Sequence, residues 1–155
     1  MKSIPFVLAS FLLTSCGIVL GDLYQPMKVP YEMTVIYVYA GDNLSTPTSV
    51  YVDRDGKTEA GDHHILLQPG GYHPVTVPSG HIRVFRGTSG DDGACIGVLA
   101  APNSSHYVRV GSDEDLLELK PATSAARQIS QTRRVNSELA TASIEGYPLD
   151  DCIVH

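Results

Sequence analysis

The sequence predicts a mainly β protein, built as a single antiparallel β-sandwich with one short C-terminal helix. Short runs rich in β-branched and aromatic residues recur from residue 33 to residue 120. Proline, glycine, asparagine and aspartate separate these runs at close spacing. Only the segment near residues 121–140 has a helical pattern. Turns at this spacing favour short strands joined by hairpins, which is typical of a small sandwich.

The run MTVIYVYA, residues 33–40, is apolar on both faces of the strand that it predicts. Successive side chains of a strand point to opposite faces. Ile36 and Val38 therefore share one face, and Val35 and Tyr37 share the other. A strand with two apolar faces is expected in the centre of a sheet.

The next strands follow with clear turn signals between them. TSVYVD (48–53) and HHILLQ (63–68) flank an Asp-Gly pair, which favours the positive φ angles of a tight hairpin turn. The other expected strands are YHPVTV (72–77), HIRVFRG (81–87), CIGVLAA (95–101), HYVRVG (106–111) and DLLELK (115–120).

The C-terminal part changes in composition and predicts a helix over about residues 121–140. Pro121 suits the first turn of a helix because its missing N–H has no partner there in any case. The side expected to face the sheets consists of Ala122, Ala125, Ala126 and Ile129, with Val135 and Leu139 prolonging it. A tail, YPLDDCIVH, follows.

The N-terminus has the features of a bacterial lipoprotein signal. Lys2 precedes an apolar run at residues 4–13, which is too short to span a bilayer. The following Leu-Thr-Ser-Cys resembles a lipobox, in which the cysteine, here Cys16, is acylated and becomes the first residue of the mature chain. The alternative is an ordinary secretory signal that is cut nearby, with Cys16 incidental.

The lipobox divides the chain into three parts. Residues 1–15 are the signal peptide, residues 16–32 are the lipidated N-terminus with a proline-containing tether, and residues 33–155 are the sandwich domain. Acyl chains on Cys16 would hold the protein at a membrane. In similar lipoproteins an aspartate after the cysteine favours the inner membrane, and Gly17 stands there instead. We therefore expect an outer-membrane anchor with the domain facing the periplasm.

Charge excludes one class of partner. The net charge is −6, and no run rich in lysine or arginine exists. Nucleic acid is therefore not an expected partner.

The cysteines indicate a disulfide bond. Once Cys16 is assigned to lipid, Cys95 and Cys152 remain, in a compartment that oxidises thiols. A bond between them would close a loop of more than fifty residues and stabilise the fold by roughly 4 kcal/mol on the chain-entropy model. The alternative is two independent buried thiols.

Several stretches together resemble a family of bacterial envelope lipoproteins, domain of unknown function 2846. They are VIYVYA (35–40), VYVDRDGK (50–57), GGYHPVTVPSGHIRVF (70–85), HYVRV (106–110) and LLELKPATSAAR (116–127). The resemblance implies a sandwich similar to immunoglobulin-like or carboxypeptidase-regulatory domains, and it supplies no catalytic residues. The chain departs from the family pattern at Arg54 and Asp55 and in the glycine-rich stretch 87–97.

One motif suggests an enzyme. GACIG, residues 93–97, has the glycine-framed form of a nucleophile elbow with Cys95 as the nucleophile. An elbow must open a helix, whereas the following VLAAPNSS predicts a strand. A cysteine hydrolase is therefore the least favoured function, and we expect no catalytic residue.

No metal or cofactor is expected either. DRDG, residues 53–56, lacks the spacing of a calcium loop and predicts a hairpin turn. His63 and His64 are adjacent on an expected strand, so their side chains point to opposite faces. A site assembled with His73 and His81 is the alternative to surface or half-buried histidines.

We therefore expect a non-enzymatic structural or protein-interaction module of the cell envelope, whose partner is another envelope or secretion-machine protein. The candidate contacts are a loop with Gly87, Ser89, Asp91 and Asp92, and an edge with Tyr72 and His73.

The alternative is a module that binds the glycan of peptidoglycan through stacked tyrosines, although the chain has no tryptophan. The candidate tyrosines are Tyr24, Tyr31, Tyr37, Tyr39, Tyr51, Tyr72 and Tyr107.

Overall fold

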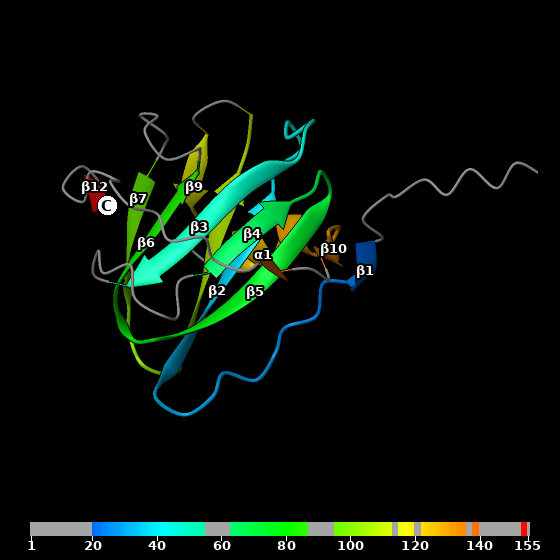
Figure 1. Ribbon diagram of the computed structural model, residues 1–155. Coiled ribbons are helices and arrows are strands. Elements are labelled where there is room, and N and C mark those ends of the chain that lie inside the picture. The colour runs from blue at the N-terminus through cyan, green and yellow to red at the C-terminus, as the bar shows by residue number, and fades with distance from the viewer. Residues whose placement is uncertain are drawn as a thin grey trace, which may run out of the picture.

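The computed structural model is a sandwich of two six-stranded β-sheets with one short helix (Figure 1). It describes residues 20–54, 63–86, 95–112, 115–119, 122–135, 138–139 and 153–154. Most neighbouring strands are antiparallel, and the two sheets pack face to face around a shared apolar core. The predicted fold class is confirmed.

The first sheet, sheet A, has the strand order β1-β10-β5-β2-β8-β9. Its strands are β1 (Leu20–Leu23), β10 (Arg133–Val135), β5 (Gly71–Pro78), β2 (Met33–Ala40), β8 (Ser104–Val110) and β9 (Leu116–Glu118). β2 lies between β5 and β8, as expected of a strand with two apolar faces.

The second sheet, sheet B, has the order β11-β4-β3-β6-β7-β12. Its strands are β11 (Glu138–Leu139), β4 (His63–Leu67), β3 (Thr48–Arg54), β6 (Gly80–Arg86), β7 (Cys95–Ala100) and β12 (Ile153–Val154). β3 and β4 pair antiparallel, as the Asp-Gly signal predicted, although the turn itself lies outside the described residues.

Three of the described pairings are parallel, which the sequence did not predict: β2 with β8, β5 with β10, and β7 with β12. Parallel neighbours cannot be joined by a tight hairpin. After β7 the chain leaves sheet B through the turn at Pro102 and Asn103 and enters sheet A beside β2. This crossover brings residues 34–40 and 104–110 into register, and it creates the site described below.

The core between the sheets is built mainly from valine, isoleucine and leucine. Ile36 and Val38 on β2 and Val50 and Val52 on β3 belong to this layer, and all four are fully buried. Such burial contributes about 1.5–3 kcal/mol for each side chain. The alternating pattern read from the sequence therefore sets the inner faces of both sheets.

The outer face of sheet A carries a second buried cluster, formed mainly by tyrosines. Helix α1 (Ala122–Ile129) and the segment 24–30 pack against it. Figure 1 shows this segment leaving β1 and running outside the sheet to the start of β2. The N-terminal tether predicted for residues 16–32 is therefore wrong from Leu20 onward, because these residues form β1 and part of the cluster.

The predicted helix is also too long. α1 ends at Ile129, and Val135 belongs to β10, where it is fully buried in the core between the sheets. Ala125 and Ile129 pack against the tyrosine cluster, so the stripe is confirmed at these two positions. Val135 instead finds partners in β1 and on the core, a tertiary arrangement that overrides the helical pattern. Among the described residues no helix has both the length and the apolar character needed to span a membrane.

Candidate functional site

The tyrosine cluster is a packed layer, closed to a ligand. Tyr24 makes edge-on contacts with Tyr37 and Tyr72, each at a ring-centroid distance of 5.3 Å. Tyr37 stacks on Tyr107 at 5.1 Å. Tyr37, Tyr72 and Tyr107 are at most 8% exposed. Aromatic pairs of this kind stabilise a fold beyond their area alone.

The polar tips of these rings are also satisfied. The hydroxyl oxygens of Tyr24 and Tyr107 are 3.0 Å apart, and Tyr37 accepts a hydrogen bond from the Met27 amide at 2.8 Å. Burial raises the pKa of Tyr24 and of Tyr37. The buried rings of Tyr37, Tyr72 and Tyr107 are therefore not available for stacking on a sugar in this structure.

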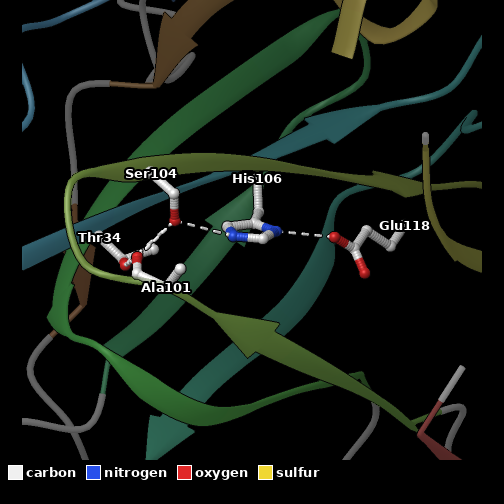
Figure 2. A network of polar contacts seen from close by, with 5 residues as sticks. All are labelled: Thr34, Ala101, Ser104, His106 and Glu118. Atoms are coloured by element: carbon white, nitrogen blue, oxygen red, sulfur yellow. Dashed lines mark hydrogen bonds and ion pairs between the residues drawn. The ribbon is translucent and has the colours of Figure 1, made fainter. Parts of the chain in front are cut away.

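A chain of serine, histidine and glutamate lies at one end of the inner face of sheet A (Figure 2). The Ser104 hydroxyl is 3.0 Å from Nε2 of His106, and Nδ1 of His106 is 2.8 Å from Oε1 of Glu118. Ser104 and His106 share a face of β8, two residues apart, and Glu118 reaches the ring from β9. The order of groups is that of a hydrolase triad.

The position of the hydroxyl proton argues against a nucleophile. A carbonyl oxygen cannot donate, so the 2.6 Å contact from Ser104 to the Ala101 carbonyl uses the single hydroxyl proton. With its proton in that bond, the Ser104 hydroxyl has only lone pairs to offer Nε2 of His106, 3.0 Å away, while Nδ1 of the same ring lies 2.8 Å from Oε1 of Glu118. A catalytic base would have to accept the serine proton instead. Thr34 donates to the same carbonyl at 2.7 Å, so the network ties β2, β8 and β9 together.

This network was not predicted from the sequence, although two of its residues lie on predicted strands. His106 and Glu118 lie on successive predicted strands, and the structure extends the first of these back to Ser104, which places Ser104 and His106 on one face of β8. The pairing of Val108 with Glu118 makes His106 the diagonal neighbour of that glutamate. The hairpin register was the missing information.

Cys95 is disulfide-bonded. A disulfide sulfur has no thiolate to attack a substrate, so the GACIG motif cannot act as a nucleophile elbow in this state. Cys152 lies outside the described residues, and the pairing of Cys95 with Cys152 stays a prediction. The parallel pairing of Ile153 with Ile96 supports it, because these residues directly follow the two cysteines.

The predicted partner contacts divide into two groups. Gly87, Ser89, Asp91 and Asp92 lie outside the described residues.

The other predicted contact surface, the edge at Tyr72 and His73, is wrong. Tyr72 and His73 are only 4% and 7% exposed, so they do not form a contact surface. Tyr72 belongs to the tyrosine cluster, and Nδ1 of His73 lies 3.0 Å from the Val135 carbonyl. The pairing of β10 with β5 covers this edge.

The histidines considered for metal binding do not come together. His64 lies against Tyr51, with ring centroids 4.3 Å apart, and its Nε2 is 3.1 Å from the Ser49 hydroxyl. Burial lowers the pKa of His64. Within the described part of the chain, no group of three or more histidine, cysteine, aspartate or glutamate side chains is placed to hold a metal ion.

The outer face of sheet B carries a buried ion pair. Arg83 on β6 and Asp53 on β3 are directly opposite each other, and their contact is bidentate. Both side chains are at most 5% exposed. Two hydrogen bonds in this fixed geometry orient both groups, so the pair links β3 to β6 and offers no free charge.

A polar cavity opens at the end of the sandwich where β2 and β8 finish. Its volume is about 300 Å³. The lining residues are Asp42, Asn43, Arg109, Asp115 and Gln128. Arg109 reaches it from the outer face of β8, two residues after Tyr107. None of these residues was singled out from the sequence, because their grouping depends on the parallel pairing of β2 with β8.

Comparisons with protein-family models, curated proteins and solved structures found no match to this chain. The resemblance to domain of unknown function 2846 therefore stays a prediction.

Proposed function

We propose that the chain is a lipid-anchored, non-enzymatic module of the bacterial cell envelope. Acylated Cys16 holds it in the outer membrane, and the sandwich faces the periplasm. There it presents its surface to another envelope or secretion-machine protein. In this proposal the fold belongs with the lipoproteins of domain of unknown function 2846.

The observation that carries the proposal is the position of β1. This strand begins at Leu20, four residues after Cys16, and it is paired with β10 in sheet A. Four residues reach at most about 14 Å. An acyl group on Cys16 would therefore keep one edge of sheet A close to the membrane surface. The other edge of sheet A, at β9, would lie farther from the lipid and toward a partner.

Two further observations support the location and the lack of catalysis. The disulfide at Cys95 fits an oxidising compartment, and such bonds are rare in the cytosol. Ser104, the serine of the triad-like network, commits its proton to a main-chain carbonyl. Both features favour a structural module over an enzyme.

The first experiment is the intact mass of the protein recovered from the membrane fraction of its native host. We expect a chain that begins at Cys16 with added acyl mass, and whose other two cysteines react with an alkylating reagent only after reduction. A Cys16→Ala variant should lose the acyl mass and leave the membrane fraction. An unlipidated chain, cut elsewhere, would contradict the anchor.

The partner is tested by crosslinking in cells. A photoreactive amino acid at position 91 should give a specific adduct, while the same residue at Tyr31, which is 82% exposed, serves as the control. The absence of any adduct specific to position 91 would remove that loop as the contact surface. Hydrolysis of ester substrates that is lost in Ser104→Ala would contradict the non-enzymatic proposal.

A further inference from the structure

The cavity at Arg109 has the groups of a binding site for a small charged molecule. A neighbouring hollow of about 320 Å³ shares two of its residues, Asp42 and Gln128, and extends between Tyr39 and Thr132. The cavity combines the guanidinium of Arg109 with the carboxylates of Asp42 and Asp115. Charges of both signs therefore face one space.

Two glycines beside the cavity allow its polar side chains to lie close to the backbone. A Cβ at Gly111 would lie 2.2 Å from Oδ2 of Asp115 and 2.7 Å from Oδ1 of Asn43. A Cβ at Gly41 would lie 3.1 Å from Cδ of Arg109. Neither glycine has a positive φ angle, so the backbone conformation does not require glycine at these positions. The absent side chains instead let the polar groups of the cavity lie against the backbone.

Arg109 has donors to spare. Its one ion pair among the described residues, from Nη2 to Oδ1 of Asp115, is long at 3.6 Å. Its Nε is buried and has no hydrogen-bond partner among the residues that the structure describes. A guanidinium has five donors, and a carboxylate is the acceptor that fits them best.

Each of the two amide side chains that line the cavity uses one of its polar groups within the protein and leaves the other for a ligand. Oε1 of Gln128 accepts from the Tyr39 hydroxyl at 3.2 Å, which leaves the amide N–H donors of Gln128 for an acceptor. Nδ2 of Asn43 donates to the Ser112 hydroxyl at 3.2 Å, which leaves Oδ1 for a donor. The cavity therefore offers donors at Arg109 and Gln128, and acceptors at Asn43 and Asp42.

We propose that this cavity binds the zwitterionic group of a free α-amino acid. The ligand carboxylate accepts hydrogen bonds from Arg109 and Gln128, and its ammonium group donates to Asp42 and Asn43. Asp115 turns from its long contact with Arg109 as the carboxylate enters. This proposal is independent of the membrane anchor and of the protein partner.

Tyr39 supports this geometry. Burial raises the pKa of its hydroxyl to about 12, while the charge of Arg109 lowers it and that of Asp42 raises it. Both charges therefore act on the same hydroxyl, at the wall of the cavity.

The test is a titration of the ¹⁵N-labelled full chain, purified in detergent with its disulfide intact, and followed by amide chemical shifts. Millimolar glycine should shift the amides of Gly41, Asn43 and Gly111 in a saturable manner. Glycinamide, which lacks the carboxylate, and N-acetylglycine, which lacks the ammonium group, should each bind at least about tenfold more weakly.

Variants assign the roles. Arg109→Gln should weaken glycine binding about tenfold or more, and Asp42→Asn should reduce the discrimination against N-acetylglycine. Arg134→Gln, at an exposed position on β10, is the matched control and should bind as the unmodified chain does. The proposal is overturned by unshifted amides at saturating glycine, by equal binding of glycinamide, or by full binding in Arg109→Gln.

Discussion

Two neighbouring rows of side chains on the outer face of sheet A differ in how they are packed. Tyr37 pairs in register with Tyr107, and one step along the same face Tyr39 pairs with Arg109. The first row lies under Tyr24 and is closed by ring contacts. The second row borders the two polar cavities. A shift of two residues along the same two strands separates a packed layer from an open site.

The difference lies in how the polar groups are satisfied. In the closed row the hydroxyls of Tyr37 and Tyr107 have partners at 2.8 Å and 3.0 Å. In the open row the guanidinium of Arg109 keeps unused donors. Buried polar groups with full hydrogen bonding fix a structure, whereas groups with spare capacity are available to a ligand.

The largest effect is expected from removing a ring of the closed row. Tyr37 is 1% exposed and contacts Tyr24, Tyr72 and Tyr107. Tyr37→Ala should lower the free energy of unfolding by about 3–5 kcal/mol, because it leaves a cavity between β2 and the covering segment. Urea unfolding of the disulfide-bonded chain measures this change.

Tyr31→Ala is the matched control, since Tyr31 is 82% exposed and lies in the same N-terminal region. Its stability should stay within about 0.5 kcal/mol of the unmodified chain. Similar losses for the two variants would mean that the tyrosine cluster is not a packed layer.

A smaller loss is expected from the other fully partnered polar set, the network of Ser104, His106 and Glu118. Glu118→Gln should lower the free energy of unfolding by about 2–3 kcal/mol, because a charged acceptor of the His106 ring is lost. Ser104→Ala should cost less, since its hydrogen bonds are to neutral acceptors or to one ring nitrogen. Stability unchanged by Glu118→Gln would leave the network without a structural role.

Adding a methyl group at a glycine beside the open row should lower stability still less, and the loss should depend on which glycine is changed. Gly111→Ala places a methyl group against the Asp115 carboxylate and should lower stability by about 1–2 kcal/mol. At Gly41→Ala the new methyl group would lie 3.1 Å from the flexible side chain of Arg109 and 3.4 Å from Oδ1 of Asn43, which is an ordinary contact, so its cost should be smaller. Thermal unfolding of both variants makes the comparison, and equal costs would contradict the assigned contacts.

Much of this fold could be predicted from local sequence, because strands and turns leave local signals. The alternation in residues 33–40 and the Asp-Gly pair after Asp53 indicated two strands that the structure contains. The N-terminal segment was misread because Tyr24 and Val29 follow no period, and they are ordered by contacts distant in sequence. The alanine-rich composition led us to predict a helix that continues past Ile129, because the pairing of β10 with β5 has no signal in the local sequence.

The candidate site was harder to predict than the fold. Arg109 and Asp42 are 67 residues apart, and only the parallel register of β2 with β8 brings them to one cavity. Parallel strands are not joined by a tight hairpin, so no turn signal in the sequence identifies them as neighbours. Spare hydrogen-bonding capacity is likewise a property of the folded arrangement, so residue types alone could not reveal it.

The smallest effect concerns Tyr39, the buried member of the open row. Below about pH 10 its hydroxyl is protonated in both the folded and the unfolded chain. Burial raises its folded pKa to about 12, so between about pH 10 and 12 the unfolded state loses the proton first and the free energy of unfolding falls. The expected loss is about 1 kcal/mol near pH 11.

Tyr39→Phe removes this titration, so its stability should decline less steeply above about pH 10, although the hydrogen bond to Gln128 is lost at every pH. Tyr24 and Tyr37, whose pKa values burial also raises, leave part of the decline in place. Urea midpoints at a series of pH values measure the difference in slope. Parallel curves for the two proteins would mean that Tyr39 ionises as easily in the folded chain as in the unfolded one, and that the wall of the cavity is open to water.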